Sequence, residues 1–72
     1  MANKKRNYHI KESKDGNLWV SMESEMVEVI RKIEGVMRVV LLQGEYLVFV
    51  SKLYDSGEVA AEIASVIDEF SQ

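Results

Sequence analysis

The side chains able to carry out chemistry are few in this sequence and form no catalytic pattern. Cysteine is absent and His9 is the only histidine, so the ligands that zinc and iron sites need are missing. Ser13 lies on the same side of a predicted strand as His9, but a rise of roughly 3.3 Å per residue leaves the two about 13 Å apart. The four glycines stand singly, so no phosphate-binding loop is present. We therefore expect no enzymatic activity, no cofactor and no metal.

The methionines offer one alternative, a copper site built from the thioethers of Met22, Met26 and Met37. Met22 and Met26 are one helical turn apart, a spacing at which methionine is typical of core packing. We therefore interpret them as core residues.

The composition is that of one globular domain. The chain has 72 residues, of which 47% are hydrophobic and 29% charged. No apolar run approaches the roughly 20 residues that cross a bilayer, and the first residues are too polar for a signal peptide. We expect a cytoplasmic protein that has no membrane contact.

Charge is distributed unevenly along the chain. Residues 1–20 hold five basic and two acidic side chains, whereas residues 21–72 hold four basic and ten acidic ones. An acidic body argues against a dedicated nucleic-acid-binding protein, which normally carries a basic face. The alternative, a nucleic-acid-associated domain, would use Lys4, Lys5 and Arg6 together with a sheet face that bears Trp19 and His9. Residues 1–6 are otherwise expected to be a disordered basic lead-in.

Two alternating segments at the start predict a hairpin. Residues 7–13 and 18–21 read as strands, and Asp15-Gly16 between them is a strong turn signal because glycine accepts a positive φ. Trp19 is expected to face away from Leu18 and Val20.

A helical period follows over residues 22–34. Met22, Met26, Val29, Ile30 and Ile33 form one stripe at the spacing of an α-helix. Ser21 or Ser24 is expected to cap its first turn, and Gly35 to end it in the left-handed conformation.

A second hairpin and helix complete the chain. Residues 36–42 and 46–53 read as strands around the turn Gln43-Gly44-Glu45, and Asp55 with Glu58 forms a capping box for a helix over residues 56–70. The order ββαββα predicts an α+β two-layer sandwich over residues 7–72, a four-stranded, mainly antiparallel sheet with both helices on one face. Strand order stays open. The expected core comprises Ile10, Val20, Met26, Ile30, Ile33, Val39, Val48, Val50, Ile63, Ile67 and Phe70.

The second hairpin is apolar on both faces, although two helices can cover only one. By alternation, one set of exposed residues would be Val40, Leu42, Leu47 and Phe49, and the other Met37, Leu41 and Tyr46, with Trp19 at the edge. We expect this face to bind a protein partner, of which a weak homodimer is the simplest version. The alternatives are that the N-terminal segment with Trp19 covers the face, or that a thin domain tolerates exposed apolar area.

One stretch resembles a known family. Residues 24–36 run Ser-Glu-Met-Val-Glu-Val-Ile-Arg-Lys-Ile-Glu-Gly-Val, followed by an apolar strand over 39–42 and by Tyr-Leu-Val-Phe-Val-Ser-Lys over 46–52. Together with the closing helix, residues 18–70 resemble the N-terminal domain of Nfu-type iron–sulfur scaffold proteins. The family's proline-containing opening is missing here, and its cluster-binding Cys-x-x-Cys belongs to a separate domain. The resemblance therefore implies an accessory or target-binding domain in iron–sulfur cluster assembly that binds no cluster itself.

Overall fold

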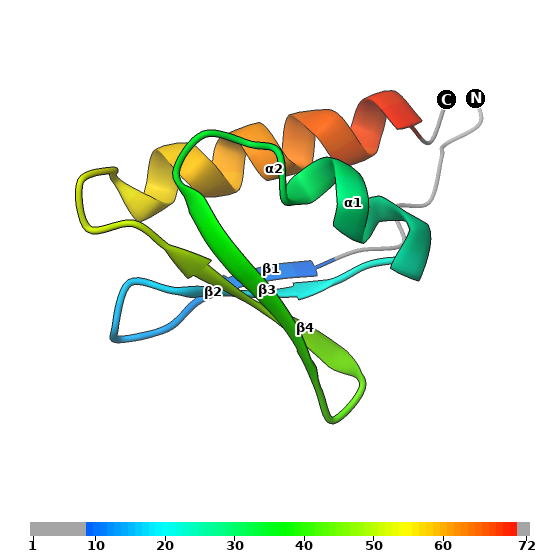
Figure 1. Cartoon of the computed structure of the whole chain (residues 1–72), viewed down its shortest axis with the longest axis horizontal. Helices are drawn as coiled ribbons and strands as arrows, with labels where there is room; N and C mark the ends of the chain where they lie inside the picture. The colour runs from blue at the N-terminus through cyan, green and yellow to red at the C-terminus, as the bar shows by residue number, and fades with distance from the viewer. Residues whose placement is uncertain (1–8, 71–72) are drawn as a thin grey trace.

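The fold has two layers, a sheet and a pair of helical segments on one side of it (Figure 1). The computed structural model describes residues 9–70. Its elements are β1 (His9–Glu12), β2 (Leu18–Ser21), the 3-10 turn η1 (Ser24–Met26), α1 (Val27–Ile30), β3 (Val36–Leu42), β4 (Glu45–Val50) and α2 (Ser56–Phe70). The predicted α+β two-layer fold is confirmed. The expected lead-in, residues 1–6, lies outside the described residues.

The sheet consists of two hairpins joined side by side in the order β1-β2-β4-β3. Every neighbouring pair is antiparallel, so β2 and β4 lie in the centre and β1 and β3 at the edges. The hairpins are also tied together by a side chain, because Asn17 Oδ1 accepts a hydrogen bond of 3.1 Å from the backbone N–H of Val50.

The turn between β3 and β4 is tighter than predicted. Gln43 and Gly44 both have positive φ, 51° and 84°, which is the pattern of a two-residue type I′ turn. Glu45 therefore belongs to β4 rather than to the turn. The far end of β4 is also earlier than predicted, at Val50, because residues 51–54 turn back with Tyr54 N–H donating to the carbonyl of Ser51 at 3.0 Å.

The first predicted helix, residues 22–34, is wrong in length. Only Val27–Ile30 is α-helical, with a 3-10 turn before it and further 3-10 hydrogen bonds after it, from Lys32 to Val29 and from Ile33 to Ile30. Four of the residues from 27 to 33 are β-branched, and such side chains lose rotamer freedom in an α-helix. The expected serine caps are also wrong, because neither helical start has a side-chain cap.

The second helix begins and ends where it was predicted, at Ser56 and Phe70. Asp55 caps it, since its Oδ2 accepts a hydrogen bond of 3.1 Å from the backbone N–H of Glu58. The Ser56 hydroxyl donates to the carboxylate of Glu12, which joins the start of α2 to the end of β1.

The core lies between the helices and one face of the sheet. Phe70 was predicted to belong to it, and this is wrong, because Phe70 is 61% exposed. Ile10, Ile33 and Val39 are partly rather than fully buried. Leu18 and Val59 are core residues that the prediction omitted. The fully assembled core consists of Leu18, Val20, Met26, Ile30, Val48, Val50, Val59, Ile63 and Ile67.

Candidate interaction surface

The open face is the side of the sheet away from the helices. The register of the strands places on it all five residues singled out from the sequence. Trp19 lies opposite Leu47, Leu47 opposite Val40, Arg38 opposite Phe49, and Leu42 opposite Glu45. Opposed residues of antiparallel strands point to the same side, so these side chains form one surface. Its apolar members are Trp19, Val40, Leu42, Leu47 and Phe49, and its charged members are Lys11, Arg38 and Glu45.

The alternation of β2 and β4 shows why this side is the open one. Leu18, Val20 and Val48 have no exposed surface and pack under the helices, so Trp19 and Leu47 between them point the other way. Within residues 9–70 no helix lies on that side of the sheet. The first of the two alternative sets of residues is therefore the one that the fold leaves away from the helices.

The second set, Met37, Leu41 and Tyr46, does not form a surface of its own. Leu41 is paired with Tyr46 on the helical side, near the tip of the β3–β4 hairpin, where Leu41 is 57% exposed. Met37 lies at a bulge, since the register jumps by one residue between Val36 and Arg38. The bulge also turns Val36, which is paired with Val50, to the helical side. Simple alternation would put Val36 on the same side as Arg38, because the two are two residues apart in the strand.

The centre of the open face is an apolar row that crosses the strands β2, β4 and β3. Trp19, Leu47 and Val40 stand side by side in it, and Lys11 extends it onto β1. The three apolar side chains are partly buried, although no helix of residues 9–70 covers them. Leu42, beyond the row, is 41% exposed.

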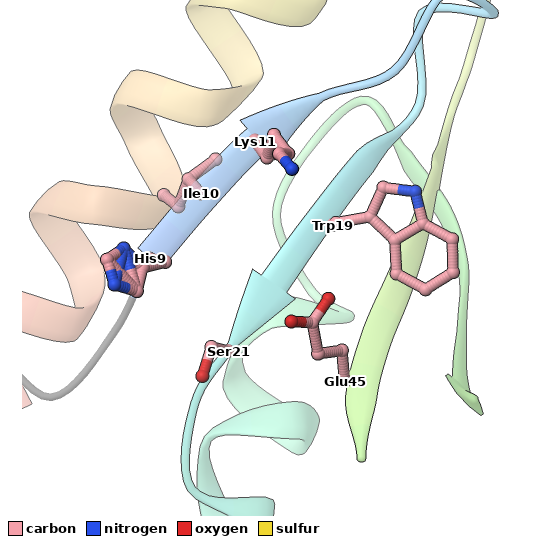
Figure 2. Close-up of a pocket in the computed structure, with 6 residues that line it drawn as sticks. All are labelled: His9, Ile10, Lys11, Trp19, Ser21 and Glu45. Atoms are coloured by element: carbon pink, nitrogen blue, oxygen red, sulfur yellow. The ribbon is translucent and has the colours of Figure 1, made fainter. Parts of the chain in front are cut away.

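Charged groups lie on both sides of this row. Figure 2 shows the hollow on one side, where Trp19, Lys11 and Glu45 project from three strands beside His9 and Ser21. The hollow on the other side is bordered by Met37, Arg38 and Phe49. There Cζ of Arg38 lies 6.0 Å from the centroid of the Phe49 ring, at the limit of a cation–π contact. The face thus has an apolar centre and a polar rim of both signs.

Glu45 is one of two members of this surface that were not predicted from the sequence. It was assigned to the turn, although a two-residue Gln-Gly turn would have placed it on β4 two residues before Leu47 and on the same side. Lys11 could likewise have been found from its strand register, because it lies opposite Trp19.

A separate hollow lies on the helical side, between the end of α1 and the start of α2. Val29, Ile33 and Val59 line it, and Glu34 and Tyr54 stand at its rim. The Glu34 carboxylate accepts a hydrogen bond from the Tyr54 hydroxyl and raises the pKa of that phenol, an effect to which the carboxylate's charge also contributes.

In the part of the chain that the structure describes, the residues of the chemical alternatives do not converge. Met26 is buried in the core and Met22 packs against it, whereas Met37 is 69% exposed on β3. His9 does share the open face with Trp19, as alternation predicted, but it lies at the edge strand opposite Ser21. Among residues 9–70 no cluster of three or more His, Cys, Asp or Glu side chains is placed to hold a metal ion. Lys4, Lys5 and Arg6 lie outside the described residues.

No helix within residues 9–70 has the length and apolar character needed to span a membrane. Comparison with known proteins gives no match: no family model, no curated protein and no solved structure is similar to this chain.

Proposed function

We propose that this chain is a small, non-catalytic protein-interaction domain that binds its partner through the open face. The observation that carries the proposal is the apolar row of Trp19, Leu47 and Val40 on the side of the sheet opposite α1 and α2. An antiparallel sheet with one solvated face normally carries polar residues there. Contiguous apolar patches with polar rims are typical of binding sites.

The residue types of the open face support a protein as the ligand. Tryptophan, phenylalanine and arginine are enriched in protein interfaces, and Trp19, Phe49 and Arg38 represent all three. Trp19 lies on a central strand, where flanking side chains can exclude water from around it once a partner binds.

The resemblance of residues 18–70 to the N-terminal domain of Nfu-type scaffold proteins supports one class of partner. On this proposal the chain is an accessory or target-binding domain in iron–sulfur cluster assembly. It supplies contact with a protein and no ligand to the cluster, because it has no cysteine.

Charge favours a protein over a nucleic acid. The helical layer, residues 22–35 and 55–70, carries nine acidic and two basic side chains, which would repel a phosphate backbone. The basic side chains of the open face, Lys11 and Arg38, share it with the acidic Glu45. A nucleic-acid partner is therefore the less favoured alternative, and the capture experiment must distinguish it from a protein partner.

The test compares partners captured from native cell extract by the wild-type chain and by Leu47→Asp. The matched control is Ala61→Asp, which adds the same charge at an exposed position of α2. Each protein captured by the wild type is then purified and its binding measured directly. We expect a partner whose affinity for Leu47→Asp is at least about tenfold lower than for the wild type, because this variant places an unpaired charge in the contact. The affinity of the same partner for Ala61→Asp should equal that for the wild type.

Two results would contradict the proposal. Capture of RNA that is lost when Lys4, Lys5 and Arg6 are replaced by alanine would favour the nucleic-acid function. Partners that bind Leu47→Asp as well as the wild type would show that the open face is not the binding surface.

A further inference from the structure

We infer that the open face binds a second copy of this chain, related to the first by a two-fold axis that runs across the strands. This inference rests on the proposed function, because it names the partner of the same surface. The evidence is the arrangement of the face in three rows: Glu45 with Leu42, then the central Trp19, Leu47 and Val40, then Phe49 with Arg38.

The central row is complementary to itself. A two-fold axis through it, parallel to it and between the facing sheets, lays each apolar side chain against the same residue type of the other copy. Trp19, Leu47 and Val40 are then removed from water on both copies. Lys11 lies at the edge of the row and is exposed, so its ammonium group can stay in solvent while the two edges face each other.

The outer rows are complementary in charge. The same axis exchanges them, so the row of Glu45 in one copy faces the row of Phe49 and Arg38 in the other. Phe49 and Glu45 are four residues apart on β4, roughly 13 Å, which keeps Arg38 and Glu45 separate within one copy. Because this axis keeps each strand against the same strand, Glu45 on β4 faces Phe49 of the other copy. The nearest opposite charge is that copy's Arg38 on the adjacent strand β3, about 4.8 Å to the side, so the two copies form two diagonal pairs of opposite charge.

The distribution of charge over the molecule favours this face over the helical side. The helical layer has a net charge of −7, from nine acidic and two basic side chains in residues 22–35 and 55–70. The remaining described residues hold four basic and three acidic side chains. Pairing by the open faces keeps the acidic layers outside, separated by two sheets about 10 Å apart, which exceeds the Debye length of about 8 Å.

The size of the face sets the strength of the contact. Four strands about 4.8 Å apart and three rows roughly 6.6 Å apart give on the order of 400 Å² per copy, against about 800 Å² in a standard interface. The dimer is accordingly weak and reversible, and it forms at high protein concentration.

The test is sedimentation equilibrium from micromolar to millimolar concentrations with charge variants at the two rim positions. Glu45→Arg and Arg38→Glu alone each turn both diagonal pairs into pairs of like charge, so we expect association to weaken about tenfold or more. The double variant Arg38→Glu/Glu45→Arg restores both pairs and recovers wild-type association. An equimolar mixture of the two single variants forms the mixed dimer. The control, Glu62→Arg at an exposed position of α2 in the helical layer, makes the same charge change without weakening association.

Three results would overturn the inference. The wild type could remain monomeric at millimolar concentration, or the single variants could associate like the wild type. A double variant that stays as weak as the single ones would exclude the paired arrangement of Arg38 and Glu45. The wild type could instead be monomeric and capture a different protein that Leu47→Asp does not bind. In that case the proposed function stands and only this inference fails.

Discussion

Gly35 lies directly against Val59, and no other residue type fits between the end of the first helical segment and α2. Its φ is 99°, in the left-handed region, and a Cβ at this position would be 2.9 Å from Cγ2 of Val59 and 3.1 Å from Cγ of Tyr54. Its carbonyl accepts a 2.8 Å hydrogen bond from the N–H of Ser51, so the backbone has little freedom to move away. One residue thus joins the turns after α1 to the second hairpin and packs against α2.

We expect Gly35→Ala to lower the free energy of unfolding by about 2–4 kcal/mol, the sum of a left-handed backbone cost and overpacking. Gly16→Ala is the matched control, because Gly16 has a φ of 87° but nothing within 4 Å of its Cβ position. Urea denaturation should show the smaller loss for Gly16→Ala, about 1–2 kcal/mol. Equal losses would mean that the contact with Val59 does not matter.

Asp55 should contribute as the cap of α2. Replacing it by alanine removes the acceptor for the N–H of Glu58, and we expect a loss of about 1 kcal/mol in the free energy of unfolding. Asp55→Asn keeps a good capping side chain and should lie within a few tenths of a kcal/mol of the wild type. The two variants are compared by thermal and urea unfolding, and an equal effect of both would disprove the cap.

The contact between Tyr54 and Glu34 predicts a pH dependence at the alkaline end. The pKa of the Tyr54 phenol is raised in the folded state because the Glu34 carboxylate accepts a hydrogen bond from its hydroxyl group. This hydrogen bond favours the neutral form of the phenol. The associated stability is fully present below pH 10, the ordinary pKa of tyrosine, and is lost as the pH rises through the higher folded value.

The measurement is the ultraviolet titration of the phenols, with Tyr54→Phe used to assign the Tyr54 transition. Glu34→Gln should move this transition toward lower pH, since the charge that opposes ionisation is removed. A Tyr54 transition that stays in place in Glu34→Gln would assign the raised pKa to another cause.

Ile63 and Phe70 test the limits of the core on α2. Ile63 has no exposed surface, so Ile63→Ala should cost about 2–5 kcal/mol through lost burial and a cavity. Phe70 is 61% exposed, so Phe70→Ala should change the free energy of unfolding by about 0.5 kcal/mol or less. A large loss at Phe70 would place its ring in the core, as the helical period alone had suggested.

The parts of the fold that could be predicted from sequence depend on local signals. Gly16, Gly44 and Asp55 act through their own turns and caps, and their positions were correct. The first helix was predicted too long because an apolar stripe has almost the same spacing whether its turns are α-helical or 3-10. Phe70 was misplaced because it continues the apolar stripe of its helix but is the last helical residue, and the tertiary structure leaves it 61% exposed.

The candidate site was predicted in composition but not in orientation. Alternation grouped Val40, Leu42, Leu47 and Phe49, yet it could not tell which side the helices cover, because that depends on how β2 pairs with β4. It also misplaced Val36, since the bulge at Met37 reverses the alternation at that end of β3. Glu45 was missed because the turn between β3 and β4 was predicted to have three residues. The turn has two, Gln43 and Gly44, and Glu45 is therefore the first residue of β4.

The most direct test of the central claim compares Leu47→Asp with Val48→Asp by urea denaturation. These adjacent residues of β4 receive the same charge, but Leu47 points to the open face and Val48 is fully buried under the helices. The open face predicts that Leu47→Asp folds cooperatively, with a loss of about 1 kcal/mol or less, whereas Val48→Asp, with an unpaired buried charge, does not fold. If Leu47→Asp unfolds the protein as Val48→Asp does, both faces of the sheet are core and the open face is not a binding surface.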